Sequence, residues 1–129
     1  MARHLQSKWR EFFMIDIHSH ILFGVDDGPE TFEQSMELLQ IAVKEGITDI
    51  IATSHVLHPS FETSAEQTVK QVHQLQEMMK LQNIPITIHT GHEIRIDERM
   101  PQLFQENKLL PLAGSNYILV ELPSRTVPV

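Results

Sequence analysis

A histidine pair two residues apart, His18 and His20, follows a short apolar segment near the start of the sequence. Residues two apart on an extended backbone point to the same side, so both imidazoles can reach one cation. The pair by itself could equally be two polar residues at the end of a strand. The spacing therefore indicates a metal site only if other ligands converge on it.

Ionisable residues recur where later strands are predicted to end. They are Asp27 at a turn, His55, Glu93 and Glu121. The carboxyl ends of parallel strands lie on one side of an α/β sheet, where ligand sites form, so we expect these side chains to converge with the histidine pair. Three imidazoles and three carboxylates exceed the needs of one tetrahedral zinc ion and suit Mn²⁺, Fe or Zn²⁺. The set predicts at least two metal ions.

Hydrolysis is the reaction class that these ligands favour. The sequence contains no cysteine, which excludes disulfides, thiolate zinc sites and cysteine nucleophiles. Two metal ions can clamp an oxyanion substrate, and a water that they activate near neutral pH can serve as the nucleophile. We therefore expect metal-activated water to replace the missing cysteine.

Several other polar residues near the predicted site leave two interpretations open. Arg95, two residues after Glu93, could bind a phosphate oxygen through its planar guanidinium or lie solvated on the surface. Asp26 and Asp27 point apart if the segment is extended, so one of them could simply cap the turn. Asp16 could accept an imidazole N–H or make a structural hydrogen bond.

The remaining histidines are mostly expected to be solvated polar residues; they are His4, His58, His73 and His92. His58 and His92 lie near the predicted site. His89 alternates with its neighbours in a predicted strand, so it could face the site or the opposite side of the sheet.

Strands alternate with helices along the chain. Apolar or β-branched runs predict four strands, at 12–17, 47–53, 84–90 and 117–122, of which the first is expected to be buried. Capping boxes that begin at Thr31 and Ser64 start two helices, which Gly46 and Pro85 end. A short helix is expected around 102–107.

This alternation predicts an α/β fold in which a parallel sheet is covered by helices, either open and doubly wound or curved towards a barrel. A complete α/β barrel usually needs about 250 residues. The chain has 129 residues and could therefore be half of a barrel.

Composition and charge limit the partners. With 41% hydrophobic residues the chain can bury the core of one domain. The formal net charge of -7 argues against binding nucleic acid or anionic membranes through diffuse electrostatics. Residues 1–13 lack the hydrophobic segment of a signal peptide, and no apolar run approaches about 18 residues. We expect a cytoplasmic protein.

Five motifs resemble one known family when they are taken in order. They are Met-Ile-Asp-Ile-His-Ser-His at 14–20, Asp-Asp-Gly at 26–28, Thr-Ser-His at 53–55, Gly-His-Glu-Ile at 91–94 and Tyr-Ile-Leu-Val-Glu at 117–121. From Met14 to about Pro128 the chain is similar to the bacterial PHP-superfamily tyrosine-protein phosphatases of capsule and exopolysaccharide loci. Phe-Glu-Thr at 61–63 and the Asp-Asp-Gly turn favour this branch over other PHP enzymes.

The resemblance implies a distorted PHP-type (β/α) barrel, of which this chain is the N-terminal half, with two or three Mn²⁺ ions that hydrolyse phosphotyrosine. It implies six metal ligands: His18, His20, Asp27, His55, Glu93 and Glu121. Glu93 is expected to be the bridging carboxylate, and His55, Glu93 and Arg95 are the expected catalytic residues. The implied substrate is an autophosphorylating tyrosine kinase that controls polysaccharide synthesis.

The chain departs from the family pattern in ways that bear on activity. We expect a flexible extension at 1–13 and a partial domain at 14–129. The family supplies a further histidine, an Asp-x-His pair and phosphate-binding arginines from strands beyond this chain. Weak metal binding and little activity are therefore expected unless a second polypeptide, or self-association, completes the fold. Phe23 also stands where relatives often have Pro.

Other functions stay open. Another PHP hydrolase, such as a small-molecule phosphatase or a nuclease, would be distinguished by its substrate preference. An amidohydrolase also begins with His-x-His after a strand, but a bridging lysine is expected where Glu93 and Glu121 stand. An inactive truncated remnant would fold poorly and would aggregate through an open sheet edge.

Overall fold

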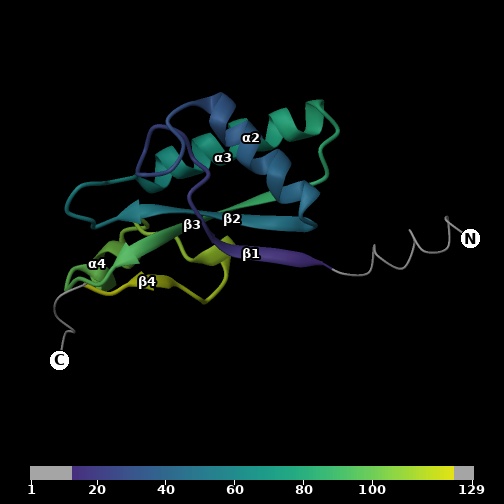
Figure 1. The fold of residues 1–129 in the computed structure, drawn as a ribbon. Helices are drawn as coiled ribbons and strands as arrows, with labels where there is room; N and C mark the ends of the chain where they lie inside the picture. Colours follow the sequence, from purple (N-terminus) through teal and green to yellow (C-terminus); the bar gives the residue numbers. More distant parts are fainter. Residues whose placement is uncertain (1–12, 124–129) are drawn as a thin grey trace, which may run out of the picture.

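Four parallel strands separated by helices make up the protein in a computed structural model that describes residues 13–123 (Figure 1). The elements are β1 (Met14–Ser19), α2 (Phe32–Lys44), β2 (Ile47–Val56), α3 (Ala65–Leu81), β3 (Thr87–Arg95), α4 (Met100–Gln105), a 3-10 turn (Leu112–Gly114) and β4 (Leu119–Glu121). The predicted extension, apart from Phe13, and His4 within it lie outside the described residues.

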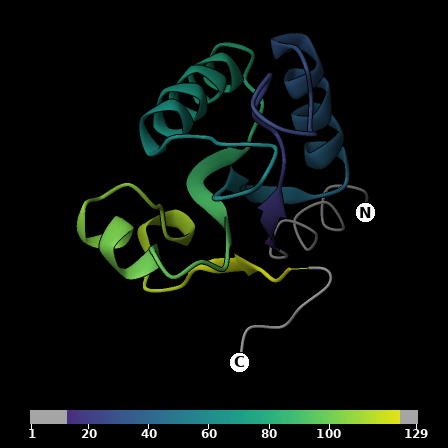
Figure 2. The same cartoon turned by 90° about the vertical axis from the view of Figure 1, so that its left-hand side faces the viewer.

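The sheet has the strand order β1-β2-β3-β4, and each neighbouring pair is parallel. Seen from the end, the sheet is curved, with α2 and α3 on one side (Figure 2). Successive strands are joined by segments that contain helices, as parallel pairing requires. The prediction of an α/β fold that forms half of a barrel is confirmed.

Both long helices begin at the predicted caps. The Thr31 side chain accepts a hydrogen bond from the backbone N–H of Gln34, and Ser64 accepts one from Gln67. These bonds satisfy amides that would otherwise have no partner in the first helical turn. Gly46 follows α2 with a φ of +90°, a conformation that favours glycine. Local sequence therefore sets the starts of both helices and the end of α2.

The main core lies between the sheet and the two long helices. Leu39 of α2 and both Leu75 and Met79 of α3 are completely buried against strand residues such as Ile50 and Ile88. Burying one such side chain contributes about 1.5–3 kcal/mol. This packing holds α2 and α3 against β2 and β3.

A smaller core positions the carboxyl ends of β2 and β3. Val56, Ile94 and Leu109 are buried together, and Leu103 and Phe104 of α4 pack against them. The predicted short helix is confirmed, although it lies two residues earlier than expected.

The middle strands run further than predicted. β2 continues to Val56, and β3 covers Thr87–Arg95 instead of 84–90. Gly91 lies inside β3. A Cβ at this position would lie 2.8 Å from Ile51 Cγ2 of β2, so there is little room for a side chain there. In contrast, β4 is limited to Leu119–Glu121.

The expectation that the first strand is buried is wrong. Met14, Ile15 and Ile17 are each more than half exposed. β1 lies at the edge of the sheet and pairs with β2 alone within residues 13–123. An apolar run therefore predicted the strand correctly but not its burial, which depends on neighbours on both faces.

Among residues 13–123, no helix combines the length and the apolar character needed to cross a membrane.

Candidate metal centre

Parallel register brings the predicted ligands to the carboxyl end of the sheet. His55 of β2 is paired with Glu93 of β3, and Arg95 of β3 is paired with Glu121 of β4. Paired residues on neighbouring strands project to the same face, so these side chains form one row. The histidine pair reaches this row from the end of β1, with His18 in the strand and His20 directly after it.

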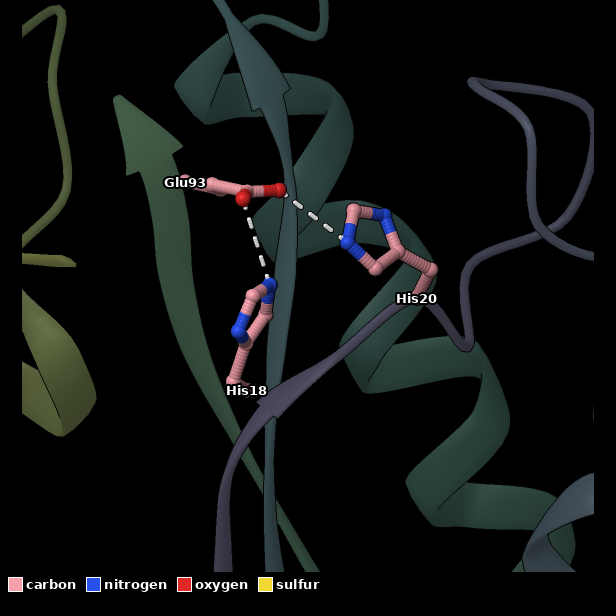
Figure 3. A group of neighbouring side chains, drawn as sticks. All are labelled: His18, His20 and Glu93. Carbon is pink, nitrogen blue, oxygen red and sulfur yellow. Dashed lines mark ion pairs between the residues drawn. The ribbon is translucent and has the colours of Figure 1, made fainter. Parts of the chain in front are cut away.

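Glu93 lies at the centre of the cluster. Its Oε1 is 3.3 Å from His18 Nε2, and its Oε2 is 3.1 Å from His20 Nε2 (Figure 3). The same Oε2 lies 3.3 Å from His55 Nδ1. The Glu93 side chain is only 11% exposed. One carboxylate thus faces three imidazoles with two oxygens, the arrangement expected of a group that bridges cations.

His55 connects Glu93 to the other two predicted carboxylates. Its Nδ1 is also 3.3 Å from Glu121 Oε2, and its Nε2 is 3.5 Å from Asp27 Oδ1. All six predicted ligands are therefore brought together, although they span more than one hundred positions of the sequence.

The ligand atoms form three overlapping groups in the part of the chain that the structure describes. The groups are His18 with His20 and Glu93, His20 with Asp27 and His55, and His55 with His58 and Glu121. Within each group the candidate ligand atoms lie within 4.8 Å of one another. The groups overlap at His20 and His55, so the candidate sites are neighbours. A neutral imidazole offers one lone pair, so each shared histidine can bind an ion in only one of its two groups.

The polar atoms of the cluster fit a divalent cation. Within residues 13–123, His55 Nδ1, Glu93 Oε2 and Glu121 Oε2 are buried without a hydrogen bond, although the carboxylate oxygens lie only 3.3 Å from the imidazole nitrogen. Buried polar atoms are costly when they lack partners. A cation that accepts lone pairs from all three atoms would satisfy them.

Asp26 supports the cluster from the turn after β1. Its Oδ2 lies 2.9 Å from His20 Nδ1, and its Oδ1 accepts a hydrogen bond from the Gly28 amide. The hydrogen bond to Asp26 raises the pKa of His20 against the opposing effect of burial. Burial tends to raise the pKa of Asp26, but hydrogen bonds from His20 and Gly28 outweigh it, so that pKa lies below its ordinary value.

Gly28 allows the turn to approach β1. A Cβ at Gly28 would lie 2.7 Å from the carbonyl oxygen of His20, so a side chain there would force the backbone apart. The Asp-Asp-Gly motif is therefore explained position by position: Asp26 is buried and makes hydrogen bonds, Asp27 faces the cluster with a side chain that is 64% exposed, and Gly28 lets the chain pass.

Arg95 lies at the edge of the cluster. Its Nη1 is 3.9 Å from Glu121 Oε1, and its side chain is 25% exposed. It is thus neither fully solvated nor tightly paired, and its remaining donors are available to an anion.

Two histidines that were expected to be mostly solvated, His58 and His92, have defined partners in the structure. His58 joins His55 and Glu121 in one candidate group, and its ring lies 5.2 Å from that of Phe61. Phe61 in turn stacks on His55 at 5.7 Å. The sequence signal that could have identified His58 as a candidate ligand was its position three residues after His55.

The expectation that His92 is solvated is wrong. It is completely buried on the helix side of β3, where its Nδ1 accepts a hydrogen bond from the Leu110 amide and its Nε2 lies 3.3 Å from Thr68 Oγ1. Burial lowers the pKa of His92 from 6.5 to about 4. Its neutral ring joins β3 to α3.

Two further alternatives are resolved by hydrogen bonds. Asp16 accepts from the backbone N–H of His18, so its bond is structural. His89 lies 2.9 Å from Asp49 and takes no part in the cluster. His73, on α3, is exposed as expected.

A groove of about 740 Å³ adjoins the cluster at His58. It runs between the segment that follows β2 and α4, where Glu62, Arg99 and Leu103 contribute to its walls. None of the six predicted ligands lines this groove, so it is a neighbour of the cluster and not its binding cavity.

Comparison with known proteins supports the resemblance found in the sequence. Residues 14–127 match the family described as capsular polysaccharide synthesis, CpsB/CapC. The chain is 36% identical over 115 residues to tyrosine-protein phosphatase YwqE of Bacillus subtilis (strain 168), covering 89% of this chain and 45% of that protein. It is 35% identical over 113 residues to tyrosine-protein phosphatase CpsB of Streptococcus pneumoniae, covering 88% and 46%.

The fold is similar to a solved structure of the same kind. A chain from the crystal structures of YwqE and CpsB, which are described as unique metal-dependent tyrosine phosphatases, matches with a TM-score of 0.84 at 36% identity. The match covers 89% of this chain and 47% of that one. The chain thus spans about half the length of the curated relatives it matches.

Proposed function

Because this chain belongs to the CpsB/CapC family, we propose that its cluster binds Mn²⁺ ions and contributes to the hydrolysis of phosphotyrosine in proteins. The observation that carries the proposal is Glu93, whose two oxygens face three imidazoles. Among the described residues, buried atoms of the cluster also have no hydrogen-bond partner. The similarity to tyrosine-protein phosphatases supplies the substrate class.

In this proposal the six residues His18, His20, Asp27, His55, Glu93 and Glu121 hold two or three ions, with Glu93 between them. Bound divalent ions would supply Lewis-acid stabilisation of phosphoryl oxygens and would lower the pKa of water. The imidazole and carboxylate ligands suit Mn²⁺ and would also accept Fe or Zn²⁺.

Arg95 is proposed to bind the phosphate. Its guanidinium is held near Glu121 at 3.9 Å and keeps free N–H donors, which can form charge-assisted hydrogen bonds with phosphoryl oxygens. His55 and Glu93 are the other proposed catalytic residues, since their side chains meet at 3.3 Å in the centre of the cluster.

The proposed substrate is an autophosphorylating tyrosine kinase in the cytoplasm that controls polysaccharide synthesis. Residues 14–129 are proposed to form part of the phosphatase domain, with 1–13 as an extension. The family description supports the link to polysaccharide synthesis, and the names of the relatives support phosphotyrosine as the substrate class.

The test measures Mn²⁺ binding and phosphate release from a phosphotyrosine peptide by the 129-residue chain. Glu93→Gln removes the bridging charge, while Glu77→Gln is a matched control on α3, where Glu77 is half-exposed beside Lys80. We expect weak Mn²⁺ binding, and little phosphate release unless self-association completes the fold, in both the wild type and Glu77→Gln. Glu93→Gln is expected to lose the Mn²⁺ binding and any release that depends on it.

Each result bears on a different part of the proposal. Equal Mn²⁺ binding by wild type and Glu93→Gln would overturn the metal site. Binding without phosphate release would retain the metal site and overturn the activity for this chain alone. If phosphate were released faster from histidinol phosphate, or an oligonucleotide were hydrolysed faster than the peptide, the proposal of phosphotyrosine as the substrate would be overturned.

A further inference from the structure

The Asp26 side chain is completely buried beside the cluster, whereas the adjacent Asp27 side chain is 64% exposed. A buried carboxylate is costly unless its oxygens accept hydrogen bonds. Asp26 therefore requires hydrogen-bond donors in fixed positions around it. The identity of these donors indicates the role of the residue.

Three donors surround Asp26. The Gly28 amide donates to Oδ1 at 2.9 Å, and His20 Nδ1 lies 2.9 Å from Oδ2. The His55 amide donates to the same Oδ2 at 3.3 Å. Asp26 thus connects two proposed ligands, His20 after β1 and His55 on β2, through a single carboxylate.

The contact with Asp26 decides which nitrogen His20 presents to a metal. When Nδ1 carries a proton donated to Asp26, the lone pair of the neutral ring lies on Nε2. Nε2 faces Glu93 Oε2 at 3.1 Å. Nδ1, by contrast, is 3.8 Å from Asp27 Oδ1 and is already engaged at the shorter distance by Asp26.

We propose that Asp26 is a positioning residue that holds His20 in the Nδ1–H tautomer and thereby assigns its Nε2 to the metal site formed with His18 and Glu93. The inference rests on the proposed function, since it concerns how the same cluster binds metal. It also assigns the shared histidine to one group: His20 would bind an ion together with His18 and Glu93. Asp27 and His55 would then bind an ion without His20.

Asparagine is not an adequate replacement at this position. Both oxygens of Asp26 accept hydrogen bonds from N–H groups, whereas Asn offers one acceptor oxygen and one NH₂ donor. If the NH₂ faced the Gly28 amide, two donors would oppose each other. If it faced His20, it would favour the tautomer with the proton on Nε2, which is the wrong nitrogen for the proposed metal site.

The experiment compares Asp26→Asn with Asp16→Asn in the full chain. Asp16 is a matched control, because it is an aspartate close in sequence to a proposed ligand, His18, and within residues 13–123 it accepts a hydrogen bond from the His18 amide alone, which Asn can still satisfy. Titration with Mn²⁺ alone, followed by electron paramagnetic resonance, is expected to show affinity lowered by roughly 10–100-fold in Asp26→Asn. Asp16→Asn is expected to bind like the wild type.

A second measurement uses wild-type protein with Zn²⁺ as a diamagnetic probe, so it does not require the variant to fold. Long-range ¹H–¹⁵N NMR of the His20 ring is expected to show a proton on Nδ1 and a metal-coordinated Nε2. In a folded Asp26→Asn variant the Nδ1 proton signal is expected to shift or vanish, which a purely structural role would not cause.

Coordination of Zn²⁺ through His20 Nδ1 in the wild type would overturn the inference, as would equal Mn²⁺ affinity in wild type and Asp26→Asn. Neither result would affect the proposed metal site itself. Failure of the wild type to bind either metal would instead overturn the proposed function, and this inference with it.

Discussion

His92 and Glu93 are neighbours on β3, but the two faces of the sheet give them opposite environments. On the helix side, His92 is completely buried, and both of its ring nitrogens have partners. On the cluster side, Glu93 is nearly as buried, yet its Oε2 has no hydrogen bond to any residue that the structure describes, and it faces two imidazoles.

Burial alone therefore does not identify a functional residue; the difference lies in whether the polar atoms are satisfied. A satisfied group such as His92 contributes to stability. Unsatisfied atoms of several residues that meet at one place indicate a ligand site. The comparison predicts that changes on the helix side affect folding, whereas changes on the cluster side affect metal binding.

The largest expected effect is on the helix side. His92→Ala removes a buried ring and leaves the Leu110 amide and the Thr68 hydroxyl without their partner, which should lower the free energy of unfolding by about 3 kcal/mol. Urea denaturation of the metal-free protein measures this loss. Glu93→Gln is expected to change the same quantity by less than about 1 kcal/mol. Equal losses in the two variants would remove the contrast between the faces.

The pH dependence of stability tests the neutral state of His92. Because burial lowers its folded pKa to about 4 from 6.5, the unfolded chain takes up the proton first, and stability is lost as pH falls from about 6.5 towards 4. Between pH 7 and pH 5 this group should account for about 2 kcal/mol. His92→Gln should therefore show a correspondingly weaker loss of unfolding free energy than the wild type.

The control for this measurement is His73→Gln, which changes an exposed histidine of α3. It should reproduce the pH dependence of the wild type. If His92→Gln did so as well, His92 would not be held neutral by burial.

On the cluster side, metal should stabilise the fold. A ligand at ten times its Kd that binds only the folded state adds about 1.4 kcal/mol to the free energy of unfolding. Thermal unfolding with and without Mn²⁺ should show this gain in the wild type and in Ser64→Ala, but not in Glu93→Gln. A full gain in Glu93→Gln would place the metal away from Glu93.

The smallest expected effect comes from the cap of α3. Ser64→Ala removes the hydrogen bond to the Gln67 amide and should cost about 1 kcal/mol in unfolding free energy. Its Mn²⁺ affinity should equal that of the wild type, because α3 lies on the face opposite the cluster. Urea denaturation and Mn²⁺ titration together check this, and a lowered affinity would show that the two faces are coupled.

The sequence by itself determined the features that depend on near neighbours. The side chains of Thr31 and Ser64 accept hydrogen bonds from amides only three residues away, so the starts of both helices were predictable. The alternation of strands and helices predicted a parallel sheet, and a parallel sheet places its strand ends on one side. That general rule was enough to predict that the six proposed ligands converge.

Only the tertiary structure decided which atoms meet and which residues are buried. The pairing of His55 with Glu93 depends on the register of two strands, and the buried position of Asp26 depends on donors from both β2 and its own turn. His92 was misjudged because α3 covers it, and β1 because it forms an edge of the sheet within residues 13–123. Burial arises from contacts between segments far apart in the chain, and local residue patterns carry little information about those contacts.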